Sequence, residues 1–342
     1  MDRVSQAVKE LVEEIQRMPE APDPAETDRH AFTLLLSGIA ACRRAPGIPC
    51  HMGYRTLYRC GDEPASEELK AHLFRLYGIY DRESLEKVCM EQFTSGREYE
   101  QFMTFWCDAP LFDLEELKEE GRRAFETRFK RASLFRPYVG ERGFYAWDIN
   151  ERIGLGRLAC ACGIIDRETF DELTDYQVRK AQVFYHTFKD YAVSCICGAV
   201  YDVPGGDEED MLSFLDLNKK LALHLLEEGG AWYRNAWYAP EKREWVSLLP
   251  HNGGCIVSKQ IEEGRAIGYM YRDSRPSEQW ADTGWRFFAG DESDEYSRNP
   301  DNFTIWSLND ICNLDATILG YAEAKEGSAF GRNAKGEWQR ER

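Results

Sequence analysis

Apolar residues recur at helical spacing through the first 230 residues of this chain, and this period most constrains its fold. Val4, Val8, Leu11, Val12 and Ile15 predict an amphipathic helix at the start. Further stretches with helical patterns cover residues 30–42, 66–78, 82–106, 113–132, 145–163, 167–201 and 207–230. Strand-like alternation is almost absent from this part, so the sequence predicts a helical domain here.

The pattern changes after residue 230. Residues 231–245 carry three tryptophans, a proline and mixed charge, and we place a domain boundary there. Short runs typical of strands follow at 254–258, 266–272, 284–288, 327–332 and 336–341, with a predicted helix over 307–324. We therefore expect an α+β protein, with an all-helical domain at 1–235 and a small α+β domain at 236–342.

The charge of the chain narrows the choice of partners. Its formal net charge is −17 over 342 residues. Residues 236–342 hold 18 acidic and 13 basic residues, a balance of −5, so both parts are acidic. This balance argues against nucleic acid or an anionic membrane as the main partner and favours a basic protein.

The sequence also predicts a cytoplasmic location. The first twenty residues contain acidic groups throughout and do not resemble a signal peptide. No run approaches 18 consecutive apolar residues, so we expect no membrane span. Eleven scattered cysteines fit reduced thiols better than a disulfide framework.

Motifs for metal, cofactor or catalytic chemistry are weak. The Cys-x-Cys pairs at Cys160/Cys162 and Cys195/Cys197 invite a zinc hypothesis. Residues i and i+2 of a helix point about 200° apart, so such a pair does not readily chelate one ion. The six histidines lack paired spacing, and the GLGR run at 154–157 lies inside a helical pattern. We expect no metal, no cofactor and no catalytic residues.

Two segments of the helical part have structural interpretations. Asp148 and Arg152 form either a surface ion pair or a buried pair that organises the core, and the neighbouring Trp147 favours burial. Residues 78–86 and 163–171 share one pattern, a glycine and isoleucine followed by an aspartate. This pattern predicts a helix end followed by a capped helix start, used twice.

The stretch GWRFFAGDESDEY at 284–296 is the main candidate site. Its acidic residues lack the glycine turn of a calcium loop and do not face one another across a cleft, as paired catalytic acids would. Two interpretations of this stretch remain: a solvated turn or a partner-binding surface. The candidate binding residues are Trp285, Asp291, Glu292, Asp294, Glu295 and Tyr296.

Two parts of the chain resemble known families. The runs GCIVSKQI, IGYMYR, DTGWRFFAGDESDEY, NPDNF and GSAFGRN resemble bacterial domain-of-unknown-function family 2185, also classed as immunity-protein family 33 of polymorphic toxin systems. FYAWDINERIGLGRLACACGIIDRETFDEL resembles domain-of-unknown-function family 1266. The first resemblance implies an α+β domain that neutralises a toxin by binding it, without assigned catalytic residues. The second implies no established activity.

Two hypotheses follow. The first is a non-enzymatic immunity-type protein that binds a protein partner, in which acidic groups steer a basic toxin and aromatic rings provide anchors. The alternative is an enzyme of unknown reaction, with a site in the cleft between the two domains lined by His251, Cys255 and acidic residues.

Overall fold

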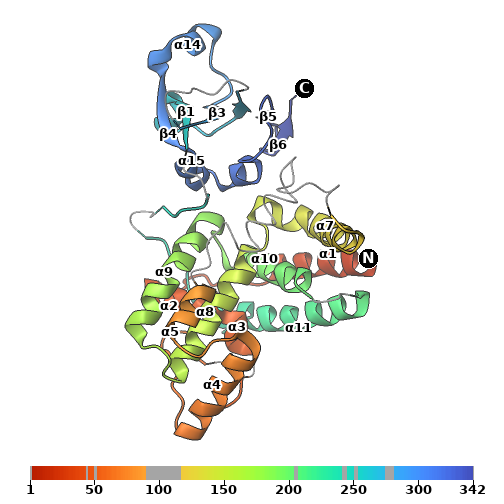
Figure 1. The fold of residues 1–342 in the computed structure, drawn as a ribbon, viewed down its shortest axis with the longest axis vertical. Helices are drawn as coiled ribbons and strands as arrows, with labels where there is room; N and C mark the ends of the chain where they lie inside the picture. Colours follow the sequence, from red (N-terminus) through yellow and green to blue (C-terminus); the bar gives the residue numbers. More distant parts are fainter. Residues whose placement is uncertain are drawn as a thin grey trace. The chain divides into compact units, whose positions relative to one another are not determined.

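The structure is a computed structural model that describes residues 2–43, 45–49, 52–89, 117–203, 207–240, 245–249, 253–273 and 281–341. The described residues form two compact units (Figure 1). The helical unit contains residues 2–89 and 119–240, and the C-terminal unit contains residues 245–341. The division of the chain into folding domains at 235/236 stays a prediction, because compactness alone does not show that either part folds by itself.

The helical unit contains helices almost exclusively. In chain order they are α1 (Asp2–Arg17), α2 (Arg29–Leu36), α3 (Gly38–Cys42), α4 (Glu63–Tyr77), α5 (Arg82–Cys89), α7 (Glu119–Val139), η2 (Gly140–Arg142), α8 (Tyr145–Ala161), α9 (Arg167–Phe184), α10 (Phe188–Tyr201), α11 (Glu208–Leu226) and α12 (Ala231–Arg234). Within the described ranges, no helix combines the length and apolar character that a membrane span requires.

Local sequence signals explain where these helices begin. The apolar stripe predicted for α1 is buried at Val4, Val8, Leu11 and Ile15. The helices α2, α4, α9, α10 and α11 each begin after a residue whose side chain accepts a hydrogen bond from the backbone N–H three residues further on. These N-cap residues are Asp28, Asp62, Asp166, Thr187 and Asp207. Each one satisfies a donor that the helix itself leaves unpaired.

Two stretches predicted as continuous helices are each divided in the structure. The stretch at 30–42 breaks at Ser37, whose hydroxyl donates to the carbonyl oxygen of Leu34. The stretch at 167–201 breaks between α9 and α10, where Thr187 caps the second helix. The threonine offers the backbone an alternative hydrogen-bond partner, and this allows the chain to change direction.

Helix α8 lies at the centre of the helical unit and is buried on nearly every side. Its contact with α3 is close, because a Cβ atom at Gly154 would lie 2.6 Å from the Cβ of Ala40. A Cβ atom at Gly198 of α10 would lie 2.4 Å from the Cβ of Trp147. Small residues therefore let the neighbouring helices approach α8, and the helical interpretation of the GLGR run is confirmed.

The repeated pattern at 78–86 and 163–171 is a repeated turn, as predicted. Gly78 and Gly163 both have the left-handed backbone, with φ of 69° and 77°. Asp81 and Asp166 then accept hydrogen bonds from the backbone N–H groups of Ser84 and Thr169, at 2.8 and 2.9 Å. The pattern therefore ends one helix and begins the next in both places.

The C-terminal unit is built on one six-stranded sheet with the order β4-β1-β3-β2-β5-β6. The strands are β1 (Gly254–Ser258), β2 (Tyr269–Arg272), β3 (Asp282–Phe288), β4 (Phe303–Ser307), β5 (Ala329–Arg332) and β6 (Trp338–Arg340). Its short helices are α13 (Lys259–Glu262), α14 (Asp294–Arg298), η3 (Pro300–Asn302), α15 (Leu308–Leu314) and η4 (Ala316–Tyr321). The strands β1 and β3 are parallel, and the other neighbours are antiparallel.

The predicted α+β fold class is confirmed. Five of the strands lie where the sequence predicts strands, and the predicted helix at 307–324 is present as α15 and η4. The strand β4 is missing from the prediction. Four of its five residues, Phe303 to Trp306, are β-branched or aromatic, but none of the five is fully buried, so no buried face repeats along the strand.

The aromatic residues near the predicted boundary divide between the two units. Trp232 stacks on Phe188 at 5.6 Å and donates its indole N–H to the carbonyl oxygen of Leu35. Trp237 also contacts Phe188, with ring centroids 5.0 Å apart. These rings therefore belong to the core of the helical unit, and Trp245 packs on Trp306 in the C-terminal unit.

Candidate partner-binding site

The site predicted at 284–296 begins on β3, which carries a bulge. Gly254 of β1 lies opposite Asp282, but Ile256 lies opposite Arg286, so two steps on β1 span four on β3. The extra residues of β3 are accommodated at Gly284, which has a φ of +81°. A side chain there would be strained, because only glycine adopts this conformation freely.

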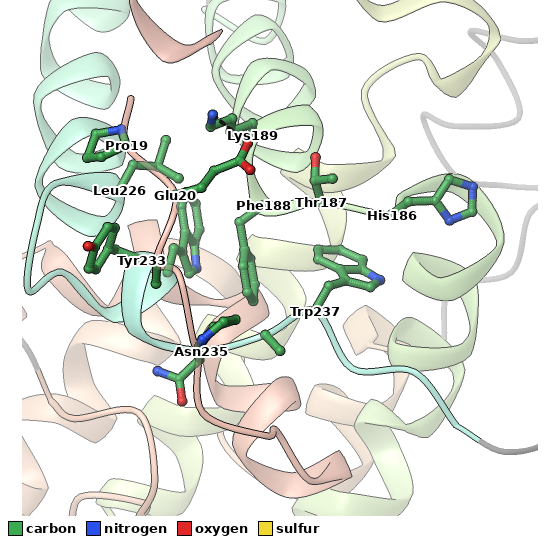
Figure 2. Close-up of a pocket in the computed structure, with 14 residues that line it drawn as sticks. Pro19, Glu20, His186, Thr187, Phe188, Lys189, Leu226, Tyr233, Asn235 and Trp237 are labelled. Carbon is green, nitrogen blue, oxygen red and sulfur yellow. Dashed lines mark hydrogen bonds and ion pairs between the residues drawn. The ribbon is translucent and has the colours of Figure 1, made fainter. Parts of the chain in front are cut away.

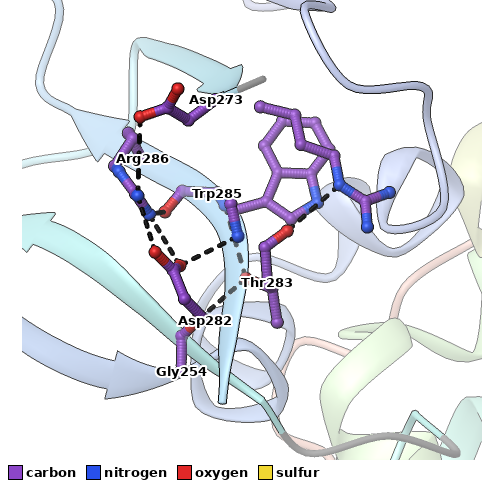
Figure 3. Close-up of polar contacts among 8 residues, drawn as sticks. Gly254, Asp273, Asp282, Thr283, Trp285 and Arg286 are labelled. Carbon is purple, nitrogen blue, oxygen red and sulfur yellow. Dashed lines mark hydrogen bonds and ion pairs between the residues drawn. The ribbon is translucent and has the colours of Figure 1, made fainter. Parts of the chain in front are cut away.

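The bulge brings Asp282 and Arg286 together as a buried ion pair (Figure 3). Their two hydrogen bonds measure 2.9 and 2.8 Å, and the side chains are 0% and 8% exposed. The Asp282 carboxylate also accepts the backbone N–H of Gly284, and Asp273 lies 3.6 Å from the guanidinium. The predictions from the sequence do not include this pair. An acidic residue and an arginine four positions apart, with a glycine between them, are the sequence pattern that indicates it.

Trp285, predicted to contact a partner, lies in the core of the C-terminal unit. Its side chain is 0% exposed. The ring stacks on Phe287 at 5.8 Å and lies 6.3 Å from Phe330. The indole N–H donates to the carbonyl oxygen of Ala322 at 2.9 Å. Trp285 is therefore a core residue, because the face of β3 that carries it is covered by the segment after η4.

Three of the predicted acidic residues lie on the surface just beyond β3. Asp291 is 64% exposed and pairs with Arg265 at 2.7 Å, and this hydrogen bond lowers the pKa of the carboxyl group. Asp294 and Glu295 form the first turn of α14 and are exposed. The structure thus brings these three carboxylates together on one exposed turn.

Glu292 has a different role from its acidic neighbours. Its two carboxylate oxygens accept the backbone N–H groups of Ala289 and Gly290, at 2.7 and 2.8 Å. Burial raises the pKa of Glu292, but hydrogen bonds from Ala289, from Ser258 and from Gly290 lower it, and the net pKa lies below its ordinary value. Glu292 therefore holds the turn that presents the acidic residues.

The turn that Glu292 holds is expected to weaken in acid. Because the folded-state pKa of Glu292 is lowered, its contribution to stability is present above the unfolded pKa and disappears as pH falls through the folded value. We expect the wild-type C-terminal unit to lose stability below about pH 4.5, the ordinary value for this group. Urea unfolding of wild type and Glu292→Gln between pH 7 and pH 3 measures this. The stability difference should shrink in acid, and parallel curves would contradict the assignment.

Tyr296 joins the acidic turn to the sheet. Its ring lies edge-on to Phe303, with centroids 5.9 Å apart, and its hydroxyl donates to the carbonyl oxygen of Asn302 at 3.2 Å. The hydroxyl also accepts a hydrogen bond from Ser258 at 3.4 Å. Tyr296 is half-buried, so part of the ring remains available at the surface.

The YAWDINER segment lies in the first half of α8. Asp148 and Arg152 are 4% and 6% exposed, and the interpretation that they are buried is confirmed. Beside them, Arg43 pairs with Glu151 at 2.9 Å and lies 4.7 Å from the centre of the Trp147 ring. The segment is therefore a charged and aromatic part of the helical core.

A cavity of about 290 Å³ lies in the same unit, at the start of α10 (Figure 2). Its aromatic lining residues are Phe188, Trp232, Tyr233 and Trp237, and an ion pair between Glu20 and Lys189 also lines it. The indole nitrogen of Trp237 is buried and makes no hydrogen bond to the described residues. None of the residues predicted as a site lies in this cavity.

The cysteines of the two Cys-x-Cys pairs are buried in the helical unit. Cys160, Cys162, Cys195 and Cys197 are free thiols, and burial raises the pKa of each. In the part of the chain that the structure describes, no three His, Cys, Asp or Glu residues are grouped to hold a metal ion.

The residues suggested for an enzyme site do not support thiolate chemistry. Cys255 is fully buried, and burial raises the pKa of its thiol. Its Sγ donates to the carbonyl oxygen of Trp306 at 3.4 Å. His251 lies outside the described residues. A nucleophilic cysteine must be exposed to solvent and readily deprotonated. Cys255 is buried and its pKa is raised, so it meets neither requirement.

Comparison with known families finds a similarity for each part of the chain. Residues 255–342 match the immunity protein Imm33 domain. Residues 72–237 match the family described as protein of unknown function (DUF1266). Both resemblances expected from the sequence are confirmed: the C-terminal part is similar to an immunity protein domain, and the helical part is similar to a family of unknown function. No curated protein and no solved structure matches the chain.

Proposed function

We propose that this chain is a non-enzymatic immunity protein of the cytoplasm, which neutralises a toxin of a polymorphic toxin system by binding it directly. The match of residues 255–342 to the immunity protein Imm33 domain carries the proposal. The exposed carboxylates of Asp291, Asp294 and Glu295 support a basic partner. The net charge of −17 acts in the same direction, because it favours encounter with a basic surface over a long range.

The contact residues we propose are Asp291, Asp294, Glu295 and Tyr296. Glu292 belongs to the same turn but acts by holding its backbone. Trp285 is removed from the set because its ring is in the core. This leaves an exposed acidic group with one half-buried ring beside it.

Reversing the three exposed charges tests the proposal. We expect Asp291→Lys/Asp294→Lys/Glu295→Lys to slow association with the toxin at least about tenfold at low salt, because steering depends on these charges. Stopped-flow association with inactivated candidate toxin domains, taken from the genes that flank this chain's own, measures the effect. Cells that express the active toxin should also lose protection.

A matched variant controls for overall charge. Glu262, Glu263 and Glu326 are also exposed in the C-terminal unit, and their replacement by lysine changes the net charge equally. This control should retain most of the association rate. Full binding and protection by the Asp291/Asp294/Glu295 variant would refute the proposed contact turn. A wild-type chain that neither binds nor protects would refute the proposed function itself.

A further inference from the structure

The two faces of the sheet in the C-terminal unit differ in burial. Side chains on one face are fully buried in the core, and rings on the other face are only half-buried. Met270 and Phe287 are paired across β2 and β3 and are 0% exposed. On the opposite face, Tyr269 pairs with Phe288 across the same two strands, and both are half-buried. Side chains alternate along each strand, so this parity separates the two faces.

The second face carries a continuous row of rings. Phe288 lies 6.1 Å from Tyr269, 5.9 Å from Tyr271 and 5.5 Å from Phe303, measured between ring centroids. Ile305 follows Phe303 by two residues on the edge strand β4, and its side chain is 61% exposed. We call these five residues, Tyr269, Tyr271, Phe288, Phe303 and Ile305, the aromatic face.

An apolar surface of this kind is unusual on a sheet. The outward face of a mainly antiparallel sheet normally carries polar side chains, which water solvates without cost. Here rings from β2, β3 and β4 and an isoleucine occupy several of those positions, although β1 lies between β3 and β4 and Arg286 shares this face with Phe288. Contiguous apolar groups at a surface are characteristic of interaction sites.

The aromatic face is continuous with the acidic turn. Tyr296 from α14 packs edge-on against Phe303. β3 passes from Phe288 directly into the segment that carries Asp291, Asp294 and Glu295. A second short helix, η3, adds the exposed Asp301. One edge of the face is therefore bordered by carboxylates.

We infer that a basic surface of the toxin binds across the aromatic face, with the acidic turn at its rim. The occupant is a protein surface rich in lysine and arginine. Its charged groups would meet the carboxylates, and its aliphatic stems and guanidinium planes would lie on the rings. This inference rests on the proposed function and adds the anchor surface, which the buried Trp285 does not provide.

A pair of arginine substitutions tests the inference. Ile305→Arg places a positive charge on the aromatic face at an exposed position, where the fold tolerates it. Leu314→Arg is the control, because Leu314 is 44% exposed on α15 in the same unit. Titration calorimetry with the inactivated candidate toxin domain that wild type binds should show at least about tenfold weaker binding for Ile305→Arg. Leu314→Arg should bind within about twofold of wild type.

A second variant, Phe288→Ser/Phe303→Ser, removes the central rings and should weaken binding similarly, provided that circular dichroism shows a folded chain. If wild type binds and Ile305→Arg binds equally well, the inference is wrong while the proposed function stands. If wild type does not bind, both are wrong. Sedimentation of the wild-type chain alone tests whether a second copy of the chain binds to the aromatic face. Self-association that Ile305→Arg abolishes would assign the face to this second copy and overturn the inference.

Discussion

Arg286→Met is expected to destabilise the C-terminal unit by about 3–5 kcal/mol, because it removes the guanidinium that donates two hydrogen bonds to the buried carboxylate of Asp282. The backbone N–H of Gly284 also donates to this carboxylate, but one neutral donor does not replace the two charged hydrogen bonds from Arg286. The hydrogen bond with Asp282 also raises the pKa of Arg286, which favours the charged guanidinium.

Hydrogen exchange of the sheet amides as a function of urea, read by mass spectrometry, measures this loss separately in each unit. A separate measurement is needed because a chain with two units need not unfold in one step. The double variant Asp282→Asn/Arg286→Met is the control. It removes both charges and should recover part of the stability. If Arg286→Met lowers the free energy of unfolding by less than about 1 kcal/mol, the pair contributes no more than a solvent-exposed ion pair does, and the prediction is wrong.

Trp285→Ala is expected to cost about 3–5 kcal/mol in the same unit, as for other large aromatic side chains removed from a core. The substitution removes the ring that stacks on Phe287 and leaves the carbonyl oxygen of Ala322 without its indole donor. The expected effect therefore falls on stability, with affinity for a partner changing only as the folded fraction falls.

The matched control for this prediction is Trp245→Ala. Trp245 lies in the same unit and is 42% exposed, so its removal should cost less than about 1 kcal/mol. Chemical unfolding followed by hydrogen exchange compares the two variants. Equal costs for the two tryptophans would contradict the assignment of Trp285 to the core. A stable Trp285→Ala chain with weakened toxin binding would return Trp285 to the contact surface.

Much of the helical unit follows from local sequence. The period of Val4, Val8 and Leu11 determines which side of α1 is buried, and the aspartate at 166 determines where α9 begins. Such signals act within one or two helical turns, so the surrounding fold is not needed to interpret them. The division between α9 and α10 was missed because Thr187 caps a helix within a continuous helical pattern.

The candidate site was less accessible to sequence reasoning. Asp291, Asp294 and Glu295 are exposed as an acidic run suggests. Glu292 has the same chemistry and the same neighbours, yet its carboxylate binds backbone N–H groups. The difference depends on how the turn after Phe288 folds back, and composition carries no information about that.

The sequence by itself determined the helical period, the caps, the strand-like runs and the acidic character of the turn at 291–295. Only the tertiary structure decided that Trp285 faces the core and Phe288 the opposite side of the sheet. A strand presents two faces by its geometry, and the elements packed on the sheet choose which one is buried. The bulge at Gly284 and the pairing of β4 with β1 likewise arise from contacts between segments far apart in the chain.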